Sequence, residues 1–122
     1  MMDRRPRVSF GVPVRNGEAT VGRCLVSILR QDFQDFEIIV SDNASSDATC
    51  ARVEAIAARD PRVRLIRQTT NLGLIENFNA LARAARGELF RWVGADDWLE
   101  PDYTSACVAA LDAHPEAIVA TS

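Results

Sequence analysis

Short apolar runs alternate with amphipathic patterns along the chain. In residues 7–12, the side chains of Val8, Phe10 and Val12 recur at every second position, which predicts a β-strand. Residues 36–41 carry a β-branched run that is typical of a strand covered on both faces. The same reasoning predicts three more strands, at residues 63–68, 89–93 and 117–121.

Between these runs, apolar residues recur at helical spacing. Val21, Cys24, Leu25, Ile28 and Leu29 follow the i, i+3, i+4, i+7, i+8 pattern of an amphipathic helix that ends near residue 31. Three further helices are predicted, at residues 47–59, from residue 74 to a stop at Gly87, and at residues 101–113. In the third of the four helices, six apolar residues share the face that we expect to be buried: Leu74, Ile75, Phe78, Leu81, Ala82 and Ala85.

The alternation of strands and helices predicts an α/β fold, a mostly parallel sheet with helices on both faces. A chain of 122 residues fits one domain, which would bury roughly two thirds of its unfolded surface. We assign residues 1–6 to a tail and residues 7–122 to the domain. Because a doubly wound domain seldom ends on its fifth strand, we expect this chain to be the amino-terminal part of a longer protein.

The composition excludes several kinds of catalytic and metal-binding site. All 14 basic residues are Arg, so the chain has no Lys for a P-loop or for a Schiff base. His114 is the only histidine, which excludes a site with several histidine ligands, and its place at a helix end favours a role with the helix dipole or at the surface. The chemistry must therefore rest on carboxylates, amides, Arg and backbone groups.

The charge and the cysteine content of the chain indicate which binding partners and which cellular compartment to expect. The net charge of −3, with both signs interspersed, offers no basic face for nucleic acid. Cys24, Cys50 and Cys107 form no CxxC pair, so we expect buried, reduced thiols, with a reactive or paired thiol as the alternative. Neither a signal peptide nor an apolar run of about 18 residues is present. We expect a cytoplasmic chain that could reach the inner face of the membrane through a part of the protein outside this sequence.

Ligands of open α/β sheets bind beyond the carboxyl ends of the strands, which here means residues 13–16, 41–47 and 94–97. Asp96 and Asp97 in the last loop could hold Mg²⁺ or Mn²⁺, although one of them could simply cap the next helix. Asp42 could accept a hydrogen bond from a base or a ribose, but it could equally shape a turn.

For other polar and aromatic residues, the sequence fits an ordinary structural role as well as a functional one. Residues 71–73, the sequence Asn-Leu-Gly, are typical of an ordinary turn. Trp92 is expected to pack in the core. Trp98 could equally pack in the core or stack on a ligand.

The spacing of these motifs is more informative than any one of them. The segments PVRNGEATVGRCLVSILRQDFQDFEIIVSDNASSDAT, NLGLIENFNALARAARG and GADDWLEPDY resemble the family 2 glycosyltransferases, which have the GT-A fold. The resemblance extends over residues 7–121. It rests on Pro13, Asn16, Cys24, Leu25, Ser27, Ile28, Gln31, Glu37 to Val40, Asp42, Ser45, Asp47, Thr49, Asn71, Gly73, Asn79, Ala85, Gly87, Asp96, Asp97 and Pro101.

The resemblance implies a nucleotide-diphospho-sugar donor, most often one with uridine, and a bound Mn²⁺ or Mg²⁺. Asp42 would accept the base N–H, Asp96 would lie near the ribose, and Asp97, with Asp96, would bind the metal ion. A metal ion that bridges the acids and the diphosphate would also stabilise the departing diphosphate, which suits a chain without Lys. The other donor-binding residues implied are Pro13, Val14, Arg15, Asn16, Asn71 and Gly73.

Three positions depart from the family pattern: Gly94 replaces an acid, Arg15 replaces a frequent aromatic residue, and Phe78 replaces a frequent Arg. In this family the acceptor site and the catalytic carboxylate base lie beyond the donor half, so we expect no catalytic base before Ser122. Family members usually invert the anomeric centre and build polysaccharides or lipid-linked glycans. The chain alone is expected to bind donor but to transfer little or no sugar to a glycan, lipid-linked or small-molecule acceptor.

Other functions fit less well. A Rossmann dehydrogenase needs GxGxxG after the first strand, and a sugar nucleotidyltransferase needs a Gly-rich basic loop there. The sequence has neither, although a nucleotidyltransferase-like α/β enzyme remains an alternative. A nucleotide-binding module without turnover is the other alternative that remains open.

Overall fold

The four described strands form one parallel sheet. The computed structural model describes residues 5–114 and contains β1 (Val8–Val14), β2 (Phe36–Asp42), β3 (Val63–Arg67) and β4 (Leu89–Trp92). The strands lie in the order β3-β2-β1-β4, and every neighbouring pair is parallel. This confirms the predicted parallel sheet, whereas the fifth predicted strand, residues 117–121, lies outside the described residues.

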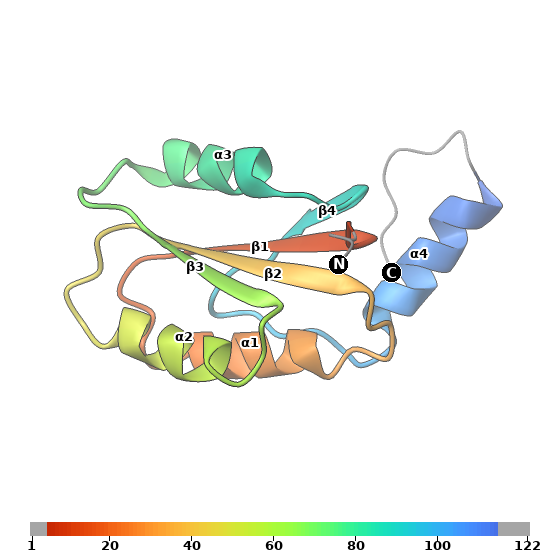
Figure 1. Cartoon of the computed structure of the whole chain (residues 1–122), viewed down its shortest axis with the longest axis horizontal. Helices are drawn as coiled ribbons and strands as arrows, with labels where there is room; N and C mark the ends of the chain where they lie inside the picture. The colour runs from red at the N-terminus through yellow and green to blue at the C-terminus, as the bar shows by residue number, and fades with distance from the viewer. Residues whose placement is uncertain (1–4, 115–122) are drawn as a thin grey trace.

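Helices cover both faces of the sheet, as predicted (Figure 1). Helices α1 (Val21–Leu29) and α2 (Thr49–Ala57) lie on one face, and α3 (Leu74–Ala84) lies on the other. Helix α4 (Tyr103–Ala113) is set apart at one end of the sheet. None of the helices between residues 5 and 114 is long and apolar enough to cross a membrane.

The main apolar core lies between the sheet and helices α1 and α2. It contains the alternate side chains Val8, Phe10 and Val12 of β1, which pack with Leu25 and Ile28 of α1. Burial of such side chains stabilises the fold by about 1.5–3 kcal/mol each. The period-two pattern of the first strand therefore identifies its core side correctly.

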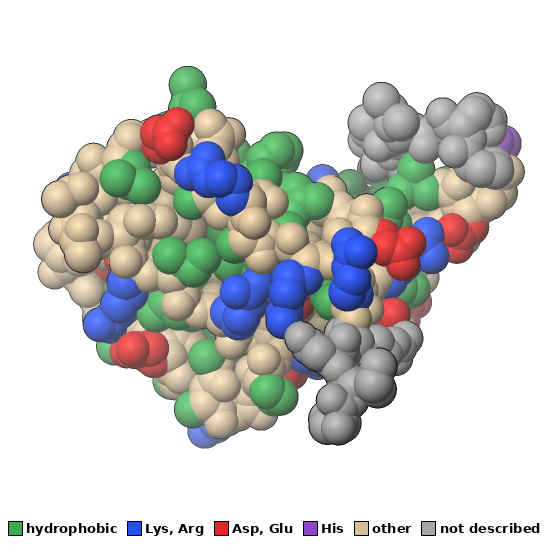
Figure 2. All heavy atoms as spheres, turned by 45° about the horizontal axis from the view of Figure 1, so that its top comes forward, with side chains coloured by type: hydrophobic (Ala, Val, Ile, Leu, Met, Phe, Trp, Pro, Cys, Tyr) green, Lys and Arg blue, Asp and Glu red, His purple; other side chains and the backbone are tan. Residues whose placement is uncertain are grey.

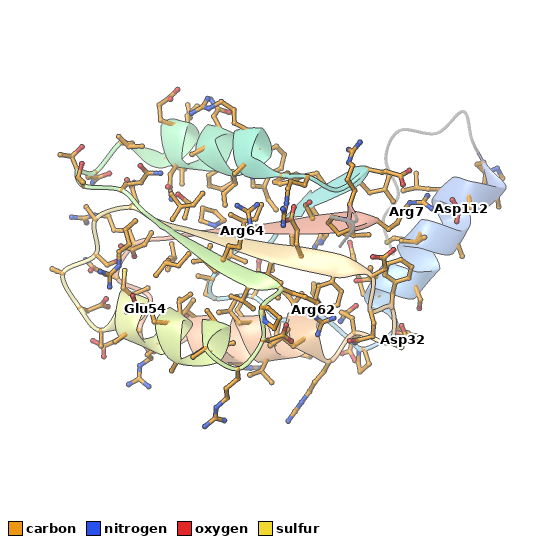
Figure 3. The ribbon with its side chains drawn as sticks, in the orientation of Figure 1. Arg7, Asp32, Glu54, Arg62, Arg64 and Asp112 are labelled. Carbon is orange, nitrogen blue, oxygen red and sulfur yellow. The ribbon has the colours of Figure 1, made fainter. Side chains whose placement is uncertain are left out.

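The α3 face of the sheet is more polar. Glu37 is buried there and accepts hydrogen bonds from Ser9 Oγ (2.6 Å), the Arg86 N–H (2.7 Å) and Arg64 Nη2 (3.1 Å). Burial alone would raise the pKa of Glu37, but these hydrogen bonds together outweigh it and lower the pKa below its usual value. Arg64 also reaches from β3 to the carbonyl of Ala84 in α3, at 2.9 Å (Figure 3).

The prediction for the buried face of the third helix is wrong at Leu74, Ile75 and Ala82 and right at Leu81, while Phe78 and Ala85 are half-buried. Leu74 and Ile75 are 72% and 74% exposed, and hydrophobic side chains lie at the surface over α3 (Figure 2). Phe78 is half-buried and Ala82 is exposed, while the buried residues of the helix are Asn77 and Leu81. Asn77 pairs with Ser41 of β2: Ser41 Oγ donates to Asn77 Oδ1 (2.7 Å), and Asn77 Nδ2 donates to the Ser41 carbonyl (3.1 Å). Helix α3 therefore turns its Asn77 side, and not its apolar side, toward β2.

Trp92 also departs from the prediction of a core position. It is 44% exposed because β4 is an edge strand of the described sheet, and its ring packs on Phe78 and Phe90. Trp98 is half exposed, with the Arg23 guanidinium 5.2 Å from its ring centre.

The cysteines follow the prediction in part. Cys24 and Cys50 are free thiols, and Cys24 is buried while Cys50 is half-buried. Cys107 is half-buried as well.

Candidate functional site

A cleft of about 390 Å³ opens at the carboxyl ends of β1 and β4. It lies where ligands of open α/β sheets bind. Its lining residues are Pro13, Val14, Arg15, Asn16, Gly17, Thr20, Asn43, Leu74, Asn77, Phe78, Gly94, Ala95 and Asp96. Of the nine residues predicted for the site, five line this cleft, and Asp42, Asn71, Gly73 and Asp97 do not.

The loop after β1 is tied to the loop after β2. Asn16 has a positive φ of 54°, its N–H donates to Ser45 Oγ (2.7 Å), and its Oδ1 accepts from the Ser46 N–H (2.8 Å). The Gly17 N–H donates to Thr49 Oγ1 at 2.9 Å. The two loops therefore form one connected wall of the cleft.

Asp42 lies beneath this wall and is buried. Its Oδ2 accepts the Ser45 N–H at 3.0 Å, and its Oδ1 accepts the Ser45 hydroxyl. Ser45 Oγ in turn accepts the Asn16 N–H, so Asp42 fixes the first loop through the second. In this structure its direct contacts are those of a turn-shaping residue.

Asn43 joins the second loop to the start of α3. Its Nδ2 donates to Asn71 Oδ1 (2.8 Å), and its Oδ1 accepts the Leu72 N–H (2.7 Å). Asn71 Oδ1 also accepts the Gly73 N–H (2.9 Å), and Gly73 has φ of 84°, a conformation that favours glycine. Asn71 and Gly73 thus set the position of α3 beside the cleft.

The acidic loop forms the opposite side of the cleft. Asp96 and Asp97 are exposed, and within residues 5–114 neither carboxylate takes part in a hydrogen bond or an ion pair. Helix α4 starts only at Tyr103, after Asp102, so neither acid caps that helix. The capping alternative therefore does not apply, and both carboxylates remain available to a ligand.

Helix α1 holds the acidic loop from below. Cys24 Sγ donates to the Gly94 carbonyl (3.4 Å), and Ser27 Oγ accepts the Leu99 N–H (3.0 Å). Gln31 Nε2 donates to the Glu100 carbonyl at 2.6 Å. Cys24 and Ser27 lie three residues apart on one side of α1, and Gln31 follows directly after the end of the helix, so all three side chains face the acidic loop and the segment that follows it.

Burial raises the pKa of the Cys24 thiol to about 12, and the charges of Asp97 and Asp96 add to this effect. Cys24 is therefore a neutral hydrogen-bond donor beneath two negative charges.

The acid pair fits a divalent cation that shares its ligands with a phosphate. The described residues contain no cluster of three or more His, Cys, Asp or Glu side chains that could hold a metal ion. Mg²⁺ typically binds through one or two carboxylates together with substrate phosphates and water, and two free carboxylates meet that requirement. Arg15 lines the same cleft with an exposed guanidinium that forms no ion pair or hydrogen bond to the described residues.

Sequence reasoning missed six side chains that line the cleft: Thr20, Asn43, Leu74, Asn77, Phe78 and Ala95. Asn43 and Asn77 are buried amides. Asn77 could have been found from the sequence, because it is an amide among the apolar positions of the predicted helix. Leu74 was assigned to the core because its spacing suits a buried face.

Residues 9–122 match the family model described as Glycosyl transferase family 2. The putative glycosyltransferase EpsH of Bacillus subtilis (strain 168) is 40% identical over 98 residues, which make up 80% of this chain and 28% of that protein.

Two solved structures are also similar. S. aureus TarS 1-349 in complex with UDP-GlcNAc matches with a TM-score of 0.83 and 29% identity, over 89% of this chain and 32% of that one. The mannosyltransferase PcManGT from Pyrobaculum calidifontis, in complex with GDP-Man and Mn²⁺, matches with a TM-score of 0.80 and 31% identity, over 88% of this chain and 33% of that one. The predicted GT-A fold is thereby confirmed, and this chain spans about a third or less of the length of these relatives.

Proposed function

Because the chain belongs to glycosyl transferase family 2, we propose that it is the donor-binding part of a metal-dependent glycosyltransferase. The donor would be a nucleotide-diphospho-sugar, and a UDP-sugar is our first choice. The observation that carries this proposal is the cleft itself, where the unpaired cation Arg15 and the free carboxylate Asp96 line one cavity beside Asp97. A diphosphate and a divalent cation would satisfy both charges.

The nucleoside would bind in the part of the cleft between the β1 loop and α3. Val14, Leu74 and Phe78 offer apolar surface to a base, and Asn43 and Asn77 offer amides nearby. We place Asp42 at the base N–H, since each carboxylate oxygen has two lone pairs and its contacts with Ser45 leave acceptor capacity. The UDP-GlcNAc complex of TarS supports the choice of uridine.

The diphosphate would lie between Arg15 and the acidic loop. Asp97, with Asp96, would hold Mn²⁺ or Mg²⁺, and the Mn²⁺ in the PcManGT complex supports this choice of cofactor. When bound, the ion would neutralise the diphosphate and stabilise it as a leaving group. Arg15 would add a second positive charge, and its planar guanidinium matches the geometry of phosphate oxygens.

We place the acceptor site and the catalytic base outside these residues, since the similar proteins are about three times as long as the matched segment. The base would deprotonate an acceptor hydroxyl, which would displace the nucleoside diphosphate with inversion. The acceptor could be a glycan, a lipid-linked sugar or a small molecule. The free thiols Cys24 and Cys50 support a reducing compartment such as the cytoplasm.

Thermal unfolding with a panel of UDP-, GDP- and TDP-sugars tests the proposal, with Mn²⁺ and with EDTA. A ligand at a hundredfold excess over its Kd stabilises the folded chain by about 2.7 kcal/mol. Asp97→Asn should abolish the part of this stabilisation that needs Mn²⁺. Glu100→Gln is the matched control, because it removes one exposed acid from the same segment outside the cleft. Stabilisation by no nucleotide, or equal stabilisation with Mn²⁺ and EDTA, would overturn the proposal.

A further inference from the structure

Asn77 of α3 is a buried amide in the wall of the cleft. Its side chain is 3% exposed, and it lines the cleft together with Leu74 and Phe78. Residues three and four apart lie on one side of a helix, so these residues form the side of α3 that faces the cleft. Leu74 and Phe78 are apolar. Asn77 is therefore the polar group that α3 brings to the cleft.

The contacts of Asn77 with β2 fix the orientation of its amide. Nδ2 donates to the Ser41 carbonyl at 3.1 Å, and a carbonyl oxygen can only accept, so this end of the amide is the nitrogen. Oδ1 accepts from Ser41 Oγ at 2.7 Å, and Ser41 Oγ itself accepts from Gln68 Nε2 at 3.1 Å. The amide of Asn77 cannot turn over without losing both of its bonds to Ser41.

One hydrogen of the Asn77 amide has no partner within residues 5–114. Nδ2 carries two hydrogens, and in this part of the chain it donates to the Ser41 carbonyl and to no other group. Buried donors without an acceptor are rare in folded proteins, whereas an oxygen with one unused lone pair is less unusual. What Asn77 lacks is therefore an acceptor.

We propose that Asn77 Nδ2 donates this hydrogen to the nucleobase of the donor, at the carbonyl that uracil carries at ring position 4 and guanine at ring position 6. Asn77 would then select uracil, thymine or guanine over cytosine and adenine. This inference rests on the proposed function and names the class of base that the site takes. Leu74 and Phe78 beside Asn77 offer apolar surface, which suits the flat ring of a base rather than a phosphate.

The selection follows from the fixed orientation of the amide. Cytosine and adenine carry an amino group at the place of this carbonyl, so a donor would face a donor. The amide cannot respond by presenting Oδ1, because Ser41 holds both of its ends. A site built to hydrogen-bond one group rejects an analogue that leaves its own polar group unpaired. One such hydrogen bond changes the affinity about tenfold.

Titration calorimetry of UDP and of CDP into the full chain, with Mn²⁺, tests the inference. We expect the wild type to bind UDP at least about tenfold more tightly than CDP, and Asn77→Ala to lower this ratio about tenfold. Ser41→Ala is the matched control. It breaks a bond of the same contact from the β2 side but keeps the amide in the cleft, held by the backbone carbonyl of residue 41.

Ser41→Ala should therefore keep the ratio of UDP to CDP affinity. Equal affinities for UDP and CDP in the wild type would overturn the inference. The same ratio in Asn77→Ala and Ser41→Ala would overturn it as well, because Asn77 would then act only through its contact with β2.

A second measurement needs no variant and keeps the inference testable if Asn77→Ala unfolds. The nucleotide 4-thio-UDP keeps the ring N–H of UDP but has sulfur, a weaker acceptor, in place of the carbonyl oxygen at position 4. We expect the wild type to bind 4-thio-UDP several-fold more weakly than UDP. Equal affinities for the two nucleotides would contradict the inference.

These measurements separate failure of the inference from failure of the proposed function. If the wild type binds UDP with Mn²⁺ but neither Asn77→Ala nor the sulfur changes the affinity, the proposed function stands and the role of Asn77 falls. If the wild type binds neither UDP nor CDP, the inference and the choice of a UDP-sugar both fail.

Discussion

Gln31 connects α1 to the segment that follows the acidic loop, and its removal tests how that loop is held. The side chain is buried, and its Nε2 donates to the carbonyls of Ser27 (3.2 Å) and Glu100 (2.6 Å). Its Oε1 accepts from the Thr104 N–H (3.0 Å) and the Thr104 hydroxyl (2.7 Å). Gln31→Ala would leave the groups on Glu100 and Thr104 without these partners.

The number of hydrogen bonds that Gln31→Ala removes sets the expected loss of stability. Each buried polar group left without a partner costs about 1–3 kcal/mol, and water that enters the new space recovers part of it. We expect Gln31→Ala to lower the free energy of unfolding by about 3 kcal/mol. Domains of this kind are stable by only about 5–15 kcal/mol, so this loss is easily measured.

Urea unfolding followed by circular dichroism measures the effect as a shift of the midpoint at constant slope. Gln34→Ala is the matched control. Its Nε2 donates to the Leu29 and Gln31 carbonyls and its Oε1 accepts from Arg62 Nη1 (3.0 Å), but the side chain is exposed and water can replace these partners, so we expect a loss below about 1 kcal/mol. Equal effects of the two substitutions would refute the account of how α1 supports the acidic loop.

Three further outcomes are expected from contacts elsewhere in the fold. Ile75→Ser should change the free energy of unfolding by less than about 0.5 kcal/mol, because Ile75 is exposed, whereas Leu81→Ala should cost about 2–5 kcal/mol in urea unfolding. Iodoacetamide at pH 8 should modify Cys50 well before Cys24, as mass spectrometry would show, since burial raises the pKa of the Cys24 thiol to about 12 and blocks access. Glu37 has a lowered pKa in the folded chain, so its carboxylate stabilises the fold above the ordinary pKa of 4.5, and this contribution is lost as the pH falls through the folded-state pKa. Glu37→Gln should therefore destabilise the chain more at pH 7 than at pH 3 in urea titrations, and equal losses at both values would contradict this assignment.

The sequence pattern predicts the sheet well for a physical reason. The strands β1 and β2 are central, so each must be apolar toward the core, and their period-two and β-branched patterns record this directly. The same reasoning fails for α3. Periodicity identifies apolar residues on a helix but not the surface that the helix meets, and β2 offers Ser41 there rather than an apolar group.

The residues of the candidate site could likewise be predicted only in part. Asp96 and Arg15 could be predicted because the loops at the carboxyl ends of parallel strands meet at one edge of the sheet. Asn43 and Asn77 enter the cleft through contacts between segments distant in sequence, Asn43 with Asn71 and Asn77 with Ser41. No local pattern encodes those contacts.

Titration calorimetry of UDP into the chain, with Mn²⁺ and with EDTA, tests the central claim most directly. We expect Mn²⁺ to increase the affinity for UDP at least about tenfold, a gain of about 1.4 kcal/mol, and Asp97→Asn to return it to the value in EDTA. An affinity for UDP that is the same with Mn²⁺, with EDTA and in Asp97→Asn would contradict the claim that this cleft binds a nucleotide through a metal ion on the acidic loop.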